Sequence, residues 1–180
     1  LFAFISSIAF ATAINAQVQF TRNGKISFYS KTPVEDIKAE NNEVVSFLDP
    51  AKGELRFQAL IKSFVFPKAA MQEHFNGKDY MNSDQYPQSN FKGTVNLKGI
   101  TFNKDGVYKV KVKGDLTLHG VTKKVDIPGT ITISKGVTNA KTVFKINRED
   151  YGVVVPSFAS SKIAKEIEIT VDCVYAPYKG

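Results

Sequence analysis

The chain has 180 residues, the length of one ordinary domain, and it is long enough to bury a sizeable core. Its net charge of +7 comes from 24 lysines and arginines against 17 aspartates and glutamates. Because the lysines are spread rather than clustered, the charge predicts a basic soluble surface that can contact an anionic membrane transiently, and it argues against nucleic acid as a partner. The single cysteine, Cys173, excludes an intramolecular disulfide.

Residues 1–16 carry no charge, are largely apolar and end in small residues before Gln17. This pattern is typical of the apolar region and cleavage site of a secretory signal peptide, here truncated at its start. A membrane-spanning helix would need roughly 20 apolar residues, and the polar Asn15 and Gln17 come too early for one. We therefore expect a cleaved signal peptide over 1–16, one domain over 17–180, and a periplasmic or secreted protein.

Short extended runs and turn formers alternate through the first part of this domain. The pair Asn23-Gly24 lies between two such runs and predicts a hairpin turn. Two further extended runs, 43–48 and 54–64, are joined by the turn-rich residues 49–53. The second run ends in a continuous apolar cluster at 64–66.

Residues 67–83 are the one convincing helical segment in the sequence. Pro67 suits the first turn of a helix, and Met71 and Phe75 fall four residues apart on one face. The pair Asn76-Gly77 predicts the end of the helix. Because this is a single short amphipathic element inserted among strands, we expect it to form a lid.

The stretch 108–119 gives the clearest strand signal in the chain. Tyr108, Val110 and Val112 alternate with lysines, and the alternation resumes at Leu116 and Leu118 after a glycine. Successive side chains of a strand point to opposite faces, so this period of two predicts one apolar face and one lysine-coated face.

Further extended runs follow the same rule at 90–97, 125–133, 142–147 and 163–175. Pro128-Gly129 suggests a bulge or an edge, and Cys173 falls on the apolar face of the last run, where we expect a small buried side chain. About eight strands joined by short turns favour a closed antiparallel barrel over a sandwich, since closure removes exposed edges. The interior of such a barrel is either filled by side chains or holds one small ligand, and the pattern alone leaves both open.

No set of residues matches a catalytic or metal-binding motif. Two histidines, His74 and His119, without a cluster of cysteines or carboxylates make a poor metal site, and we expect both to bond or pack locally. The charged group 148–150 predicts a solvated turn, because neighbouring residues of an extended chain point apart. The serines within 157–161 lack the GxSxG turn of a hydrolase. We expect no catalytic residue, metal or cofactor.

Three segments resemble the YceI-like, polyisoprenoid-binding family of exported bacterial proteins. They read FPKAAMQEHFNGKDYMNSDQYPQSNFKG, GDLTLHGVTKKV and INREDYGVVVPSFASSKIAKEIEITVD. The resemblance covers about residues 24–175, and it is most specific at LTLHGVTK. It implies an all-β fold, an extended eight-stranded antiparallel lipocalin-like barrel with one short helical lid segment. It also implies an isoprenoid or similar amphiphile in the lumen, without metal or catalytic residues.

On this interpretation the apolar faces of the lid and strands line the lumen. The expected lining residues are Phe64, Phe66, Met71, Phe75, Tyr80, Phe91, Val110, Val112, Leu116, Leu118, Phe144, Ile146, Ile167 and Ile169. Expected polar contacts are His74, Arg148 and Tyr151.

The expected function is non-catalytic binding, sequestration or transport of a polyisoprenoid, quinone-like or fatty acyl lipid. Two alternatives stay open at this point: an enzyme acting on an apolar substrate, and a filled-core stress or adhesion protein. The oligomeric state stays open as well.

Overall fold

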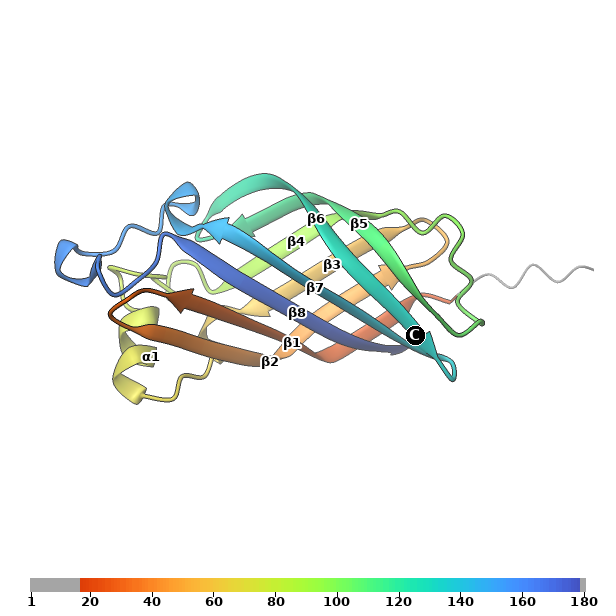
Figure 1. Cartoon of the computed structure of the whole chain (residues 1–180), viewed down its shortest axis with the longest axis horizontal. Helices are drawn as coiled ribbons and strands as arrows, with labels where there is room; N and C mark the ends of the chain where they lie inside the picture. Colours follow the sequence, from red (N-terminus) through yellow and green to blue (C-terminus); the bar gives the residue numbers. More distant parts are fainter. Residues whose placement is uncertain (1–16, 179–180) are drawn as a thin grey trace, which may run out of the picture.

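The computed structural model describes residues 17–178. The expected signal peptide at 1–16 lies outside the described residues. The eight strands form one closed antiparallel barrel in which each strand pairs with its neighbours in sequence and β1 pairs with β8, as expected (Figure 1). The strands are β1 (Gln19–Lys31), β2 (Asp36–Asp49), β3 (Glu54–Leu60), β4 (Gln88–Val95), β5 (Gly106–Leu118), β6 (Val121–Ser134), β7 (Val137–Asn147) and β8 (Glu166–Pro177).

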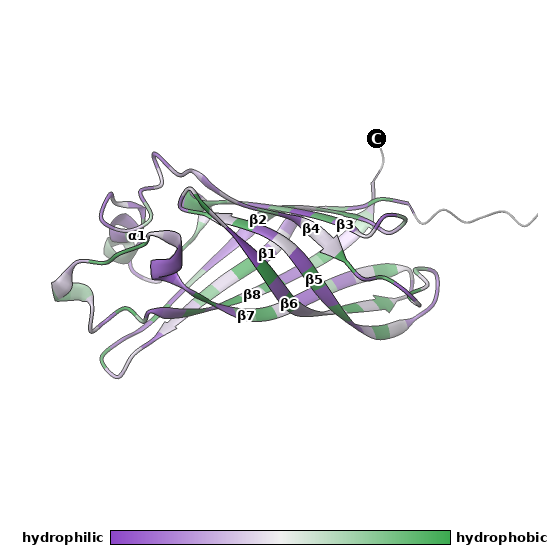
Figure 2. Ribbon diagram, turned by 90° about the horizontal axis from the view of Figure 1, so that it is seen from above, coloured by the Kyte–Doolittle hydropathy of each residue, from purple (hydrophilic) through white to green (hydrophobic). Residues whose placement is uncertain are grey.

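Strands of up to 14 residues make the barrel long, since each residue adds about 3.3 Å. Figure 2 shows hydrophobic and hydrophilic residues alternating along these strands. The helix α1 (Ala69–Asn76) and the short 3₁₀ helices η1 (Ile61–Ser63), η2 (Arg148–Tyr151) and η3 (Ser157–Ala159) belong to the connecting segments. In Figure 1, α1 and the segment that follows β7 lie at one end of the barrel, and the C-terminal end of β8 lies at the other.

The helix is shorter than predicted. It begins at Ala69 rather than near Pro67, and it ends where the Gly77 N–H bonds the carbonyls of Glu73 and His74. The pair Asn76-Gly77 therefore ends the helix as the sequence indicates, and turns rather than helix continue to Gln85.

The predicted hairpin at Asn23-Gly24 is wrong, because β1 runs through both residues as one strand with an irregular register at this point. Gly24 packs so closely that a Cβ atom built on it would lie 2.7 Å from the Cys173 Sγ and 3.2 Å from the Val44 Cβ. The glycine is thus required by a close approach inside the barrel, not by a turn.

Pro128 lies at an edge and not at a bulge. Strand β6 pairs with β5 without interruption through Lys111 and Pro128, whereas its pairing with β7 covers only Thr130–Ser134. Strand β2 behaves in the same way, since its pairing with β3 covers only Val45–Asp49. Towards the end that carries α1, the β6–β7 ladder is therefore incomplete, and β2 pairs instead with the chain just after β3, through a bridge between Glu40 and Val65.

Opposite α1, the barrel interior is filled. A buried cluster occupies this end and consists of Leu48, Val95, Val110, Ile131, Ile133, Cys173 and Tyr175. Within it, the Tyr175 hydroxyl lies 2.8 Å from the Ser46 Oγ. Cys173 is only 1% exposed within this cluster, so it is a packed apolar side chain, as the sequence predicts. The same burial raises the pKa of its thiol to about 12.

The close contact of Gly24 with Cys173 and Val44 can be tested by mutation. Gly24→Ala should lower the free energy of unfolding by about 1–3 kcal/mol, because the new methyl group overlaps a packed core. The cost should fall in a Cys173→Ala background, where Sγ is gone, and denaturant unfolding of the four chains of this cycle measures the difference. Equal costs in both backgrounds would contradict the contact.

Candidate functional site

The other half of the barrel is hollow. A cavity of about 680 Å³ occupies the end that carries α1, within the range of small-molecule sites. Its wall includes the exposed residues His74, Asp79, Phe158 and Lys162, so the cavity reaches the surface between α1 and the segment 152–165. We call this opening the mouth.

The structure places every predicted lining residue except Val110 on the wall of this cavity. They are Phe64, Phe66, Met71, Phe75, Tyr80, Phe91, Val112, Leu116, Leu118, Phe144, Ile146, Ile167 and Ile169. Their contact with a ligand stays a prediction.

Val110 lies elsewhere, in the buried cluster of the filled end. Two residues further along the same face of β5, Val112 is on the cavity wall. Alternation assigns a side chain to the inner face of a strand, but it does not say how far along the barrel axis the cavity extends.

Several cavity residues are absent from the predicted lining set, although the alternation of the run 54–64 does place Leu55, Phe57 and Ala59 on one face. On β1 and β2 these are Ile26, Phe28 and Ile37, on β3 they are Leu55, Phe57 and Ala59, and from the segment 152–165 they are Val153, Val155, Phe158, Ala159 and Ile163. The alternation of Ile26 and Phe28 was available as a signal, but the predicted hairpin obscured it. The segment 152–165 has no strand or helix periodicity that could have identified it.

An aromatic cluster closes one side of the cavity and holds α1 in place. The Phe75 ring of α1 stacks on Phe28 of β1 at 5.5 Å between centroids and lies 5.0 Å from Phe66 and 5.7 Å from Phe64. Aromatic pairs at such distances contribute about 0.5–1.5 kcal/mol each beyond the area they bury. The lid predicted from sequence is therefore packed against the barrel.

Within the lumen, hydroxyl groups are engaged by the protein backbone. The Ser30 Oγ accepts a hydrogen bond from the Ala164 N–H at 2.9 Å, Ser89 donates to the Thr117 carbonyl at 2.9 Å, and Thr142 donates to the Pro128 carbonyl at 2.6 Å. The charged residues of the wall are Glu35, Asp79, Arg148 and Lys162. Three of these side chains come from the turns and loops around the mouth, and Arg148 lies at the end of β7.

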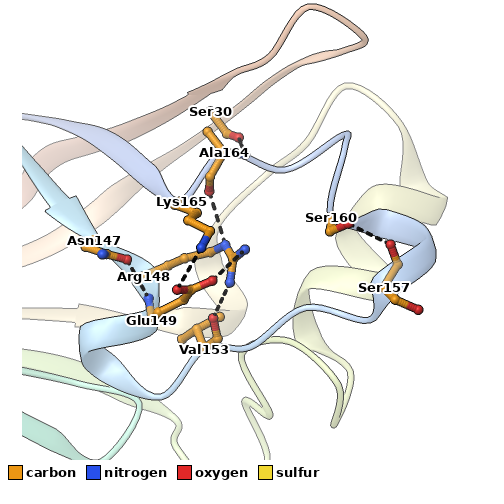
Figure 3. A network of polar contacts seen from close by, with 9 residues as sticks. All are labelled: Ser30, Asn147, Arg148, Glu149, Val153, Ser157, Ser160, Ala164 and Lys165. Carbon is orange, nitrogen blue, oxygen red and sulfur yellow. Dashed lines mark hydrogen bonds and ion pairs between the residues drawn. The ribbon is translucent and has the colours of Figure 1, made fainter.

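Arg148 joins the ends of the segment that borders the mouth (Figure 3). Its Nε donates to the Ala164 carbonyl at 3.1 Å and one terminal nitrogen donates to the Val153 carbonyl at 2.7 Å, while the other lies 3.5 Å from a Glu149 carboxylate oxygen. The residue is only 7% exposed. The predicted solvated turn is therefore wrong for Arg148, although its local pairing with Glu149 is present.

The other predicted polar residues divide between the mouth and the core. His74 lies at the mouth, where its ring stacks on Tyr80 at 6.2 Å between centroids. Tyr151 is not on the cavity wall; it is the last residue of η2 and is buried, and burial raises the pKa of its phenol. His119 bonds a distant carbonyl rather than a local one, since its Nδ1 lies 3.2 Å from the Tyr151 oxygen.

The described residues contain no group of three or more histidines, cysteines or carboxylates placed to hold a metal ion. In residues 17–178, no helix has the length and apolar character needed to cross a membrane.

Comparison with known proteins places this fold and cavity in a family. The model of the YceI-like domain matches residues 6–175. The chain belongs to the YceI-like family.

Two relatives show how much of the chain is shared. A UPF0312 protein of Pseudomonas fluorescens is 29% identical over 137 residues, which cover 72% of this chain and 60% of that protein. A UPF0312 protein of Photorhabdus laumondii is 36% identical over 77 residues, which cover 43% of this chain and 36% of that protein. The chain thus spans less than two thirds of the length of either relative.

A solved YceI-like neighbour shares the architecture. It comes from Saccharophagus degradans and is described as a polyisoprenoid binding domain implicated in plant cell wall breakdown. It has a TM-score of 0.77 and 14% identity to this chain, and the match covers 90% of this chain and 99% of the neighbour. At this identity the comparison shows the lipocalin-like fold alone.

The stretch LTLHGVTK, on which the resemblance to the YceI-like family mainly rests, forms the β5–β6 turn. His119 and Gly120 both have positive φ angles, 50° and 75°, which suits the two-residue turn of a hairpin. The His119 ring packs on Tyr86 at 4.4 Å between centroids and faces the η2 carbonyl of Tyr151. The motif thus connects three segments at the cavity end.

Removing the Arg148 guanidinium should destabilise the protein. Arg148→Ala leaves the buried carbonyls of Val153 and Ala164 without their donors, and we expect a loss of about 2–4 kcal/mol in the free energy of unfolding. Arg56→Ala is the matched control, because Arg56 is an exposed arginine paired only with Glu54, and it should change stability by no more than about 0.5 kcal/mol. Similar losses for both variants in denaturant unfolding would refute the structural role of Arg148.

Proposed function

We propose that this YceI-like protein binds a long apolar lipid in the barrel cavity and sequesters or carries it without changing it chemically. The proposal rests on how apolar and charged side chains are distributed over the cavity wall. Apolar side chains from all eight strands and α1 line the lumen, and the charged side chains lie around the mouth. A wall of this kind suits an amphiphile whose apolar chain lies inside and whose polar end lies at the mouth.

The energetics favour a long chain. Each buried CH₂ group contributes about 0.8 kcal/mol, so a dozen of them supply roughly 10 kcal/mol. This is comparable to the estimated 4–15 kcal/mol that association costs in lost freedom of motion. A molecule of only a few carbon atoms would gain too little from the same wall.

The neighbour from Saccharophagus degradans supports an isoprenoid as the ligand class, since it is described as a polyisoprenoid binding domain. A quinone-like or fatty acyl lipid has the same elongated apolar chemistry. The apolar stretch at 1–16 supports an exported, periplasmic or secreted protein.

A catalytic role has no comparable observation in its favour. Arg148 has three bonding partners within the protein, and the lumen hydroxyls of Ser89 and Thr142 donate to backbone carbonyls. These groups stabilise the cavity wall.

Organic extraction of protein purified from its native host, followed by mass spectrometry, tests the proposal directly. We expect an isoprenoid, quinone or fatty acyl species in molar proportion to the protein. Repeated recovery of protein without any lipid would count against the proposal.

Narrowing the cavity should weaken binding without unfolding the barrel. Ile146→Trp adds bulk to the lumen wall, and we expect at least about tenfold weaker binding of the apolar fluorophore N-phenyl-1-naphthylamine, a change of about 1.4 kcal/mol. Val143→Trp is the control on the same strand, because Val143 is exposed and should leave the Kd unchanged. Thermal unfolding checks that both variants fold, and Ile169→Trp repeats the test from β8. Equal Kd values for lumen and surface variants would contradict the assignment of the cavity.

A further inference from the structure

The segment that borders the mouth, residues 152–165, exposes apolar side chains that the barrel does not need. Phe158 is 78% exposed and Val154 is 68% exposed. Among the described residues, Phe158 is the most exposed of the large hydrophobic side chains. What distinguishes Phe158 from other exposed apolar residues is that it lies at the rim of an apolar cavity and on the same short segment as Val154.

The packing of the segment 152–165 against the barrel determines which of its side chains are exposed. Val153, Val155 and Ala159 are buried, so alternate residues anchor the chain while Val154 and Phe158 point outwards.

Hydrogen bonds also hold this segment in place. The Ala164 N–H donates to the Ser30 Oγ, and the Ser160 hydroxyl donates to the Ser157 carbonyl at 2.7 Å (Figure 3). Phe158 is therefore presented by a fixed turn, η3, and not by a loose chain.

The charges of the segment indicate the kind of partner. It contains two lysines, Lys162 and Lys165, and no aspartate or glutamate. Lys165 lies 3.4 Å from a Glu149 carboxylate oxygen, whereas no carboxylate of the described residues lies within 4.0 Å of the Lys162 ammonium. Two acidic residues lie elsewhere on the same wall, Glu35 of the β1–β2 turn and Asp79 of the turn after α1, and neither belongs to the segment 152–165. Exposed apolar side chains flanked by lysines and serines are typical of surfaces that enter the head-group region of a bilayer.

We propose that residues 152–165 dock the mouth of the barrel onto the surface of an anionic phospholipid bilayer. Phe158 and Val154 enter the head-group region, and Lys162 pairs with lipid phosphates. Because Phe158 also forms part of the cavity wall, the docked mouth gives a lipid chain a path between bilayer and lumen that avoids water. The docking surface goes beyond the proposed lipid binding and can be tested without it.

The chain contains no tryptophan, so a single introduced tryptophan reports on its own surroundings. In the full chain, Phe158→Trp should show a blue-shifted emission and quenching by brominated lipids when mixed with vesicles of phosphatidylglycerol and phosphatidylethanolamine. Val107→Trp is the matched control, since Val107 is 71% exposed at the filled end of the barrel. The proposal is overturned if Phe158→Trp shows no shift, if Val107→Trp shows an equal one, or if phosphatidylcholine vesicles act as strongly as anionic ones.

Co-sedimentation with the same anionic vesicles gives a second measurement. Val154→Asp and Phe158→Asp should each weaken partitioning at least tenfold, while Val107→Asp should leave it unchanged. Loss of partitioning by all three variants, or by none, contradicts docking through this segment.

Binding of N-phenyl-1-naphthylamine in the absence of vesicles separates the two proposals. Val154→Asp should retain probe binding within about twofold, because Val154 is exposed and is not on the cavity wall. Probe binding without vesicle docking would overturn only the docking surface. Vesicle docking by a chain that binds no apolar probe would overturn only the proposed function.

Discussion

The cavity depends on where neighbouring strands stay paired. At the filled end β2 pairs with β3 and β6 pairs with β7, and inward side chains such as Leu48 and Ile131 belong to one buried cluster. Towards the other end, β6 has no ladder with β7, and β2 leaves β3 and is joined to the segment after it by the bridge between Glu40 and Val65. Inward residues there face a wider lumen that they cannot fill, because close packing requires side chains to touch across the core. The hollow half of the barrel thus coincides with the end at which these two ladders are incomplete.

Two connecting segments cover the wider end, and they are held by different sets of contacts. The segment that contains α1 packs through Phe75 into an aromatic cluster and is also bonded to the barrel by the backbone pair of Glu40 and Val65. The segment after β7 is fixed by hydrogen bonds from Arg148 to the carbonyls of Val153 and Ala164. Backbone hydrogen bonds therefore fix both sides of the mouth, and a buried side-chain guanidinium supplies them on the side after β7.

The alternation of residues was enough to predict the barrel and most of the cavity wall. Val112, Leu116 and Leu118 follow from period two alone, because each inner-face position of a long strand faces the lumen. The sequence could not indicate where packing ends and the cavity begins, and so Val110 was assigned to the wrong half. Gly24 was misjudged because glycine serves both turns and close approaches. Arg148 was predicted to be solvated because its partners are the backbone carbonyls of Val153 and Ala164. Every residue has such a carbonyl, so the sequence does not identify them as partners.

The seam between β6 and β7 also bears on how the protein avoids self-association. Over residues 121–129, β6 pairs with β5 and, among the described strands, with no other. One side of its backbone could therefore template a strand from another copy. Lys123, Lys124 and Pro128 are exposed along this stretch, and proline has no N–H to donate while lysines repel a second copy of the same edge. The opening of the barrel wall thus occurs where the sequence already discourages edge-to-edge aggregation.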